Sequence, residues 1–571
     1  MKNREIARIF DNIADILEIK EENRFRIRAY RKAAQTFQGL AEDAGLLAVE
    51  KKLTDLDGIG KDLASKAEEY LKTGRIKFYE SLKKTVSKSV LELMDIPGIG
   101  PKTAALLADK LKVRSRKDLE KKARAGKIKN IFGIKEKTVD NILRGIEFLE
   151  KSAERITLEV ASSIAGEFVG RLEALREVKK IEVAGSLRRM KETVRDIDIL
   201  VTSKKPDKIM KVFTRVPRAG EVLAQGPTKS SLITTDNVQV DLRVVEPSSF
   251  GSAILYFTGS KSHNIKLRKL AMSKGLKINE YGIFKIKSRK RLAGAREEDM
   301  YKALGLSYIS PELREDTGEI EKAAKGKLPR LVEFGDIKGD LHVHSASSDG
   351  VMRLEAIASA CEEMGYEYMA VTDHSASLGV AGGLKEKELF RNMSKIDKIN
   401  KKLKKARLLK GAEVDILDDG RLDYRDSVLK ELDFVVAALH SGFKQTKEKL
   451  TERILRAMGN RYVNVIAHPT GRLIGVRAGY DIDLDKILKK AVGTNTALEI
   501  NAYPERLDLG DSASRRAKEL GVKISIATDT HTRDQFANMR YGVSVARRGW
   551  LEKKDVLNTL SLKELLKKIK K

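Results

Sequence analysis

Six of the seven histidines of this chain lie after residue 340, and each stands in or next to an apolar run that is typical of a buried strand. Stretches with helical periodicity separate these runs, so strands and helices alternate from residue 338 onward. That alternation predicts a β/α barrel, which gathers the polar ends of its parallel strands at one rim. Scattered structural histidines would not recur at strand ends. The feature therefore predicts a metal site at the carboxyl rim of a barrel.

Imidazole and carboxylate side chains of this segment form a candidate ligand set. The H-x-H pair of DLHVHS sends both rings to one face of a strand, and a carboxylate such as Glu413 can bridge two ions. The nine candidate ligands are His342, His344, Asp349, His374, Glu413, His440, His468, Asp529 and His531. One such histidine alone is more often structural, but the full set favours up to three Zn²⁺ or Mn²⁺ ions. Such a site binds phosphate and activates water, so we expect phosphoester hydrolysis.

A second acidic cluster is predicted in residues 151–246, where apolar strand-like runs and helical stretches indicate an α/β unit. Asp196 and Asp198 are two residues apart in DIDILV, so both carboxylates lie on one face of a strand. Asp241 lies on another apolar strand, VQVDLRVV, that can run beside the first. Three such carboxylates can hold two Mg²⁺ or Mn²⁺ ions around a phosphoryl group. Taken alone, D-x-D is as often a plain polar strand face.

A small turn upstream of these aspartates favours the metal site over the polar face. In VAGSLRR, Gly185 and Ser186 can hold a triphosphate through backbone N–H groups and a hydroxyl, and Arg189 can neutralise its charge. Together, the turn and the aspartates predict a nucleotidyltransferase site.

The first 150 residues read as short amphipathic helices joined by glycine turns, so this region is predicted to be all-α. A loose repeat, LDGIGKDLASKAEEYL at 56–71 and IPGIGPKTAALLADKL at 96–111, has a weaker third copy at 131–143. Glycine turns of this kind aim backbone N–H groups and a helix N-terminus at a phosphate, although they also serve helix packing alone. The candidate DNA contacts are Gly58, Gly60, Lys61, Gly98, Gly100 and Lys102.

The charge of the chain agrees with a polyanionic partner. Its 571 residues include 112 Lys and Arg against 82 Asp and Glu, a net charge of +30 that attracts nucleic acid, a ribosome-like particle or a membrane surface alike. One cysteine excludes a disulfide framework and a cysteine zinc finger. Without an apolar run of roughly 18 residues or a signal-like start, we expect a soluble, cytoplasmic protein with no membrane segment.

The ordered motifs resemble those of the family X DNA polymerases, and the region after 338 resembles the PHP domain, named for polymerases and histidinol phosphatases. The segment YFTGSKSHNIKLRKLAMSKGLKINEYGIF at 256–284 is similar to the nucleotide-selecting segment of that family. The resemblance implies that Tyr256 and Phe257 lie under the sugar and that Gly259 also binds the nucleotide. It also implies that Asn264 contacts the base and Arg268 the template strand.

Lys66 follows the first glycine turn, where repair members of this family carry a lysine that forms a Schiff base. A lysine attacks an abasic-site aldehyde only when its pKa is lowered. Asp62 stands where those members have a phosphate-binding lysine. An ordinary surface lysine on an amphipathic helix is the alternative interpretation.

The resemblance to bacterial and archaeal family X polymerases with a PHP domain implies a chain that fills short gaps in DNA repair, including base excision repair. The PHP domain is then expected to act as a 3′→5′ exonuclease, and in some members as an abasic-site endonuclease or 3′-phosphatase. Its partners would be gapped or nicked DNA and deoxynucleoside triphosphates, with a monomer as the default. Two other hypotheses are a small-molecule phosphatase with a degenerate polymerase half and a non-enzymatic DNA-binding scaffold.

These motifs divide the chain into six predicted parts. They are a helical DNA-end-binding domain at 1–85, a fingers-like helical domain at 86–150, a nucleotidyltransferase palm at 151–246, a thumb-like nucleotide-selecting domain at 247–313, a linker at 314–337 and a PHP metallohydrolase domain at 338–571.

Overall fold

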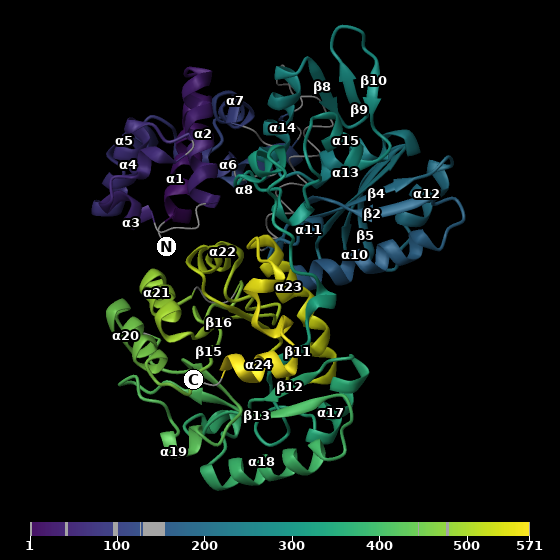
Figure 1. Ribbon diagram of the computed structural model, residues 1–571. Helices are drawn as coiled ribbons and strands as arrows, with labels where there is room; N and C mark the ends of the chain where they lie inside the picture. The colour runs from purple at the N-terminus through teal and green to yellow at the C-terminus, as the bar shows by residue number, and fades with distance from the viewer. Residues whose placement is uncertain are drawn as a thin grey trace. The chain divides into compact units, whose positions relative to one another are not determined.

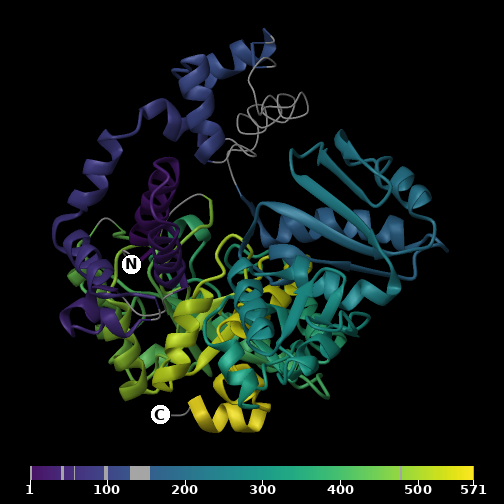
Figure 2. The ribbon, with the colours of Figure 1, turned by 90° about the horizontal axis from the view of Figure 1, so that it is seen from above.

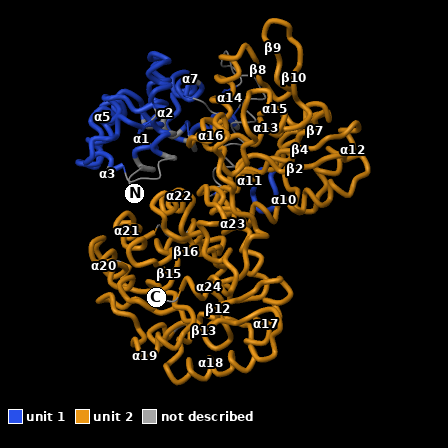
Figure 3. Tube along the Cα trace, in the orientation of Figure 1, with its two compact units in different colours: residues 1–155, 233–239 blue, residues 156–232, 240–571 orange. Residues whose placement is uncertain are grey.

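The chain forms two compact units in the computed structural model (Figure 3). The first comprises residues 1–155 and 233–239, and the second comprises 156–232 and 240–571. The structure describes residues 3–39, 44–56, 58–94, 101–125, 127–128, 155–443, 445–475 and 479–569.

Helices make up the described part of residues 3–128, as predicted. They are α1 (Asn3–Ile19), α2 (Arg24–Gly39), α3 (Ala44–Val49), η1 (Leu53–Asp55), α4 (Lys61–Thr73), α5 (Lys77–Lys84), α6 (Lys88–Met94), α7 (Pro101–Leu111) and α8 (Arg116–Arg124). In α1, apolar residues three or four apart, among them Phe10 and Ile13, form a fully buried stripe. Phe10 packs edge-on against Tyr30 and Phe37 of α2, with ring centroids 5.7 and 5.6 Å apart.

The palm contains a five-stranded sheet in the order β2-β4-β7-β6-β5. Its strands are β2 (Lys180–Val183), β4 (Asp196–Thr202), β5 (Ala219–Gln225), β6 (Lys229–Thr234) and β7 (Gln239–Val245). A smaller pair joins β1 (Ile156–Thr157) to β3 (Thr193–Val194). The helices are α10 (Leu158–Glu173), α11 (Gly185–Arg188) and α12 (Pro206–Phe213). Helix α10 lies along the sheet (Figure 2). It packs on α12, where the rings of Phe168 and Phe213 are 5.4 Å apart.

The thumb pairs helices with a three-stranded antiparallel sheet, β10-β9-β8. Its elements are η2 (Pro247–Ser249), α13 (Phe250–Thr258), α14 (Lys261–Ser273), β8 (Leu276–Asn279), β9 (Gly282–Lys285), β10 (Arg291–Ala293), α15 (Glu297–Ala303) and η3 (Pro311–Leu313). The segment 314–337, predicted as a linker, forms α16 (Glu319–Ala324) and η4 (Phe334–Asp336), and it packs Ile320 and Leu331 into the thumb core. It is ordered because these apolar residues, sparse among charged ones, find a buried surface.

The thumb also contains a buried charge cluster. Arg314 is completely buried, donates to Glu297 and to the Ile309 carbonyl oxygen, and has its guanidinium 5.2 Å from the ring centre of Tyr301. Arg188 of the palm forms a bidentate pair with the same Glu297 at 2.8 and 2.9 Å. Burial opposes ionisation of Glu297, but Arg314 and Arg188 outweigh it and lower the pKa of this carboxyl to about 2.

Replacing Arg314 with methionine should lower the free energy of unfolding of the thumb by about 3–5 kcal/mol, because one member of a buried ion pair is lost. The chain has one tryptophan, Trp550, and it lies in the thumb core, so its fluorescence during urea denaturation reports this loss. Arg296, paired with Glu298 at the surface at 3.6 Å, offers a matched Arg→Met control with a change under about 1 kcal/mol. Equal effects of the two substitutions would contradict the prediction.

The carboxy-terminal region is a seven-stranded parallel barrel, as predicted (Figure 1). Its strands are β11 (Gly339–Val343), β12 (Tyr368–Val371), β13 (Arg407–Asp415), β14 (Phe434–Ala438), β15 (Val465–Ile466), β16 (Ala497–Asn501) and β17 (Ile524–Ala527). The barrel nearly closes, because Val343 bridges Thr530 just beyond β17 and the His344 N–H donates to the Thr530 carbonyl oxygen at 2.8 Å. The helices are α17 (Leu354–Glu363), α18 (Glu386–Asn400), α19 (Asp426–Leu429), α20 (Lys447–Met458), α21 (Leu484–Thr494), α22 (Asp511–Leu520), α23 (Met539–Arg548) and α24 (Leu562–Ile569).

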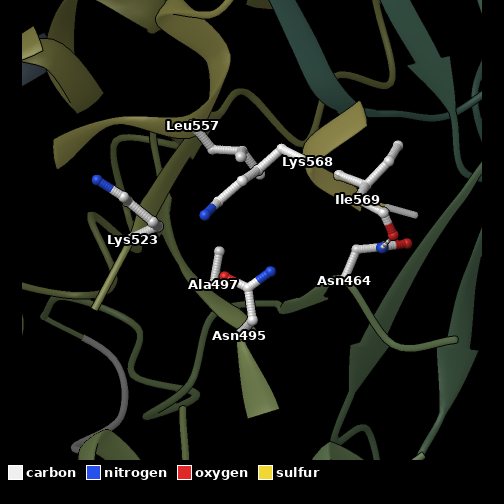
Figure 4. Close-up of a pocket in the computed structure, with 7 residues that line it drawn as sticks. All are labelled: Asn464, Asn495, Ala497, Lys523, Leu557, Lys568 and Ile569. Atoms are coloured by element: carbon white, nitrogen blue, oxygen red, sulfur yellow. Dashed lines mark hydrogen bonds between the residues drawn. The ribbon is translucent and has the colours of Figure 1, made fainter. Parts of the chain in front are cut away.

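Helix α24 packs at the amino ends of the barrel strands, where it buries Leu565 completely. A small pocket between α24 and these strand ends is lined by Asn464, Asn495, Ala497, Lys523, Leu557, Lys568 and Ile569 (Figure 4). In the part of the chain that the structure describes, no helix has both the length and the apolar character needed to cross a membrane.

Candidate functional site

The carboxyl rim of the barrel, opposite the pocket of Figure 4, gathers the nine candidate metal ligands. His342 lies within β11 and Glu413 within β13. Asp349 lies in the loop after β11, and the other six ligands come within a few residues after the end of a strand. Three groups of ligand atoms each lie within 4.8 Å of one another. The groups are His344, Asp349, His374 and His531; His342, His344 and Asp529; and His374, Glu413 and His440. His344 and His374 each belong to two groups, so neighbouring groups share ligands.

Glu413 lies at the centre of this constellation. Its Oε2 is 2.8 Å from Nδ1 of His374 and 3.4 Å from Nε2 of His342. Its Oε1 is 3.1 Å from Nε2 of His468 and 3.3 Å from Nε2 of His440. One carboxylate therefore faces imidazoles from several strands, as a bridging ligand must.

Unpartnered ring nitrogens indicate that these side chains fit metal ions. Nε2 of His342, both nitrogens of His344 and Nδ1 of His374 are buried and lie 2.8 to 3.5 Å from carboxylate oxygens, yet none of them makes a hydrogen bond of normal geometry to a described residue. A buried polar atom without a partner is costly, and coordination of a cation would satisfy it.

The electrostatics of the rim favour positive charge. Burial disfavours a charged ring, yet Glu413 and Asp349 outweigh it and raise the pKa of His374 to about 10. In turn, burial opposes ionisation of Glu413, but His440 and His374 hold the pKa of its carboxyl well below the ordinary value. The same field attracts a divalent cation.

Three residues that sequence reasoning missed orient the ligands. Glu499 accepts from Nδ1 of His342 at 2.7 Å, and Asp415 is hydrogen-bonded to Nδ1 of His440. Asn501 donates to Asp529 at 3.0 Å. Such partners fix the tautomer and orientation of a metal-binding ring. Their only sequence signal is the two-residue spacing of Glu499 and Asn501 within ALEIN and of Asp415 after Glu413.

In the palm, strand alternation presents the three aspartates on one face. Asp196 and Asp198 share a face of β4, and Asp241 lies on the neighbouring strand β7. Burial, with repulsion from Asp196 and Asp241, raises the pKa of Asp198 to about 7. The three carboxylates thus lie close enough to repel one another, and a cation held between them would remove that repulsion.

The predicted Gly-Ser turn lies directly against this cluster. Gly185 begins α11 with φ +61°, and a Cβ at this position would lie 2.3 Å from Oδ2 of Asp198, so only glycine fits. The Ser186 hydroxyl is buried and has no hydrogen-bond partner in the described part of the chain. An unpartnered hydroxyl beside a carboxylate cluster fits a phosphate oxygen of a nucleotide.

The other predicted nucleotide-binding residues meet where α11, α13 and α14 converge. Arg189 donates from Nη1 to the Thr258 carbonyl oxygen at 2.5 Å, and its Nη1 would lie 3.2 Å from a Cβ on Gly259. The rings of Tyr256 and Phe257 pack edge-to-face, 5.1 Å apart.

The side chains of α14 are linked to the same place. Asn264 donates to the Tyr256 carbonyl oxygen at 2.7 Å, and Arg268 donates from Nε to the Asn264 carbonyl oxygen at 3.3 Å. The structure therefore brings all the predicted nucleotide-binding residues of palm and thumb to one region.

The first helical unit contains the predicted DNA-backbone turn. Gly58 has φ +79° and lies under the side chain of Lys32, while Gly60 is the N-cap of α4 and the exposed Lys61 is its first residue. Open backbone and a cation at a helix N-terminus suit a phosphate. In the second copy, Gly98 and Gly100 lie outside the described residues, as does the side chain of Lys102 in α7.

Lys66 lies one helical turn beyond Asp62 on α4 and pairs with its carboxylate. The Lys66 side chain is 14% exposed, and its ammonium is 5.2 Å from the ring centre of Phe78. The lysine is thus shielded by an aromatic ring and held by one carboxylate.

The fold and the two sites define a class of protein, a nucleotidyltransferase joined to a metal-dependent PHP-type phosphoesterase barrel, with helix-hairpin-helix domains that bind DNA. Family models match the helical parts, the thumb and the barrel. The matches are a helix-hairpin-helix domain over 1–76, a SAM-like helix-hairpin-helix tandem over 90–147, a DNA polymerase beta thumb over 253–315 and a PHP domain over 340–502.

Curated relatives agree with this class. The chain is 40% identical over 567 residues to the DNA polymerase/3′-5′ exonuclease PolX of Bacillus subtilis (strain 168), covering 99% of both chains. A probable phosphatase of Thermoanaerobacter sp. (strain X514) is 29% identical over 245 residues, 41% of this chain and 95% of the relative. One of Clostridium acetobutylicum is 30% identical over 203 residues, 34% of this chain and 78% of the relative. The chain belongs to the family X DNA polymerases that carry a carboxy-terminal PHP domain.

Proposed function

We propose that this chain is a DNA polymerase that fills short gaps during DNA repair and that its PHP barrel is a metal-dependent 3′→5′ exonuclease. The observation that carries the proposal is that one chain of the family X type contains both a carboxylate cluster in the palm and a ligand cluster in the barrel. Eight of the nine barrel candidates belong to the three ligand groups, and the ninth, His468, has its Nε2 3.1 Å from Glu413. Gapped or nicked DNA and deoxynucleoside triphosphates are the proposed substrates, and a cytoplasmic monomer is the proposed form.

In the palm, Asp196, Asp198 and Asp241 would hold Mg²⁺ or Mn²⁺, which supplies charge neutralisation to the transferring phosphoryl group when bound. Asp241 would assist removal of the proton from the primer 3′-hydroxyl. The Ser186 hydroxyl and the Arg189 guanidinium would bind the triphosphate, and the backbone at Gly185 lets it approach the aspartates.

In the barrel, the nine rim ligands would hold up to three Zn²⁺ or Mn²⁺ ions, whose bound state supplies Lewis acidity toward a phosphodiester. Glu499 and Asp415 orient His342 and His440 for this task. The same rim suits an abasic-site endonuclease or a 3′-phosphatase, because all three reactions cleave a phosphoester at or near a 3′ end.

The whole-chain relationship supports this function over the two alternatives. A small-molecule phosphatase with a degenerate polymerase half would not keep three aspartates clustered beside an unpartnered serine hydroxyl. A non-enzymatic scaffold would not keep buried imidazoles without partners around a carboxylate.

A gel assay on a 5′-labelled duplex with a one-nucleotide gap and Mn²⁺ tests the proposal. We expect extension by one nucleotide when deoxynucleotides are present, shortening from the 3′ end when they are absent, and neither reaction in excess EDTA. If the wild-type chain neither extends nor shortens the primer, the proposed function is wrong, and phosphomonoesters become the substrates to screen.

We further propose that Lys66 attacks the aldehyde of an incised abasic site. Borohydride reduction of the wild-type chain on such DNA should then give a covalent adduct, and Lys66→Ala should lower its yield at least tenfold, because the adduct needs that amine. Lys72, an exposed lysine near the end of the same helix, is the matched control, and Lys72→Ala should keep the adduct. An equal yield from wild type and Lys66→Ala would exclude this role.

A further inference from the structure

Arg548, at the end of α23 in the barrel, contacts the nucleotide-binding region of the polymerase half. Its Nη1 donates to the main-chain oxygen of Arg189 at 2.8 Å and to Oε1 of Glu315 at 3.1 Å. Its Nε and Nη2 donate to Oδ2 of Asp511 at 2.9 and 2.6 Å. One guanidinium thus joins a barrel carboxylate to the palm.

Burial makes this contact specific. The Arg548 side chain is 2% exposed, and a buried guanidinium needs a partner for each donor. Burial opposes ionisation of Glu315, yet Arg548, Lys191 and Arg189 lower the pKa of this carboxyl to about 2. Glu315 is therefore a charged link between two arginines.

Arg189 is held at three points. Its main-chain oxygen accepts from Arg548, its Nε donates to Glu315 at 3.0 Å, and its Nη1 donates to the Thr258 carbonyl oxygen. This leaves Nη2 as the one guanidinium nitrogen without a hydrogen-bond partner among the described residues. A side chain fixed in this way presents its remaining donor in one direction, which is what a triphosphate-binding arginine requires.

A second link runs parallel to the first. Arg472, in the loop after β15, forms a bidentate pair with Glu192 of the palm at 2.8 and 3.1 Å. Glu192 is three residues after Arg189, so barrel residues hold both ends of this short stretch of the palm.

We propose that Arg548 is a positioning residue for DNA synthesis: through Glu315 and the main chain of Arg189, the barrel sets the direction of the arginine that binds the incoming nucleotide. The proposal rests on the proposed polymerase function and on Arg189 as the triphosphate contact. The barrel, which has its own metal site, thus also helps to build the nucleotide site of the polymerase half.

Steady-state single-nucleotide gap filling by the full chain tests this. Arg548→Met should raise the KM for the deoxynucleotide about tenfold, as loss of a charge-assisted hydrogen bond implies, and change kcat less. The Kd for gapped DNA and the rate of 3′ shortening should stay at wild-type values. Arg548→Lys should have a KM between those of the wild type and Arg548→Met. An ammonium group can reach one of the carboxylates, but not Asp511, Glu315 and the Arg189 carbonyl oxygen together.

Arg547 provides the matched control. It is the neighbouring residue of α23 and binds the same polymerase segment, through Glu312 at 2.7 Å and the Val332 carbonyl oxygen at 3.1 Å, without touching Arg189 or Glu315. Arg547→Met should leave the KM within twofold of wild type. A similar rise in both variants would mean that the contact only stabilises the fold and would overturn the proposal.

An unchanged KM in Arg548→Met would overturn it as well. If that variant does not fold, as judged by its rate of 3′ shortening, the isosteric Glu315→Gln weakens the same link and should also raise the KM. An unchanged KM in Glu315→Gln would also overturn the proposal. Absence of extension by the wild-type chain would instead contradict the proposed function itself.

Discussion

Asp198→Asn should lower the rate of primer extension by roughly a thousandfold and leave 3′ shortening at the wild-type rate. Asp196 and Asp241 lie close enough to Asp198 to raise its pKa, and all three carboxylates would hold the proposed ions. Because an amide at this position removes one negative charge from the set, several kcal/mol of transition-state stabilisation are lost. The gapped-duplex assay measures both reactions on one gel, with and without deoxynucleotides.

The control for this substitution lies on the next strand. Glu182 is an exposed carboxylate on β2, paired in register with Leu200 of β4, and Glu182→Gln should extend normally. If Asp198→Asn kept more than about one tenth of the wild-type extension rate, Asp198 would not be a ligand of the catalytic metal ions. Loss of 3′ shortening in the same variant would argue against two separate sites.

Glu413→Gln should have the opposite selectivity, with 3′ shortening reduced by roughly a thousandfold and extension retained. Its carboxylate faces four imidazoles within 3.4 Å, so an amide there removes a bridging negative charge and places N–H donors where ligand oxygens are needed. We expect the zinc or manganese content of the purified chain, measured by mass spectrometry, to fall by at least one ion.

Asp419 is a suitable control because it is an exposed carboxylate in the loop after β13, hydrogen-bonded to Arg421. Asp419→Asn should keep both the metal content and the shortening rate. A Glu413→Gln chain that retained its metal and its exonuclease would show that the rim is not the hydrolytic site.

The sequence predicted the fold class because its signals are local. Strand alternation, helical periodicity and glycine turns depend on neighbouring residues, and the helical start, the α/β unit and the parallel barrel are all confirmed. Local signals did not predict the structure of the segment 314–337. Its few apolar residues are buried by contact with the thumb core, which a local pattern does not show.

Some residues of the candidate sites could be predicted from the sequence and others could not. Histidines and aspartates at strand ends can be selected by residue type and spacing, and the structure brings those candidates together. Glu499 and Asp415 could not be separated from ordinary polar strand residues, because their roles depend on which ring they meet. Arg548 and Glu315 are 233 positions apart, and no local pattern links residues at such a separation.

Trp550 follows α23 of the barrel, yet its indole is packed among the apolar side chains of the thumb. The two catalytic halves are therefore not interchangeable modules joined end to end. A chain that stopped before the barrel would lose the Trp550 indole from this cluster, and the thumb would expose apolar surface to water. Removal of the exonuclease domain would therefore also weaken the polymerase half, so the stabilities of the two halves are coupled.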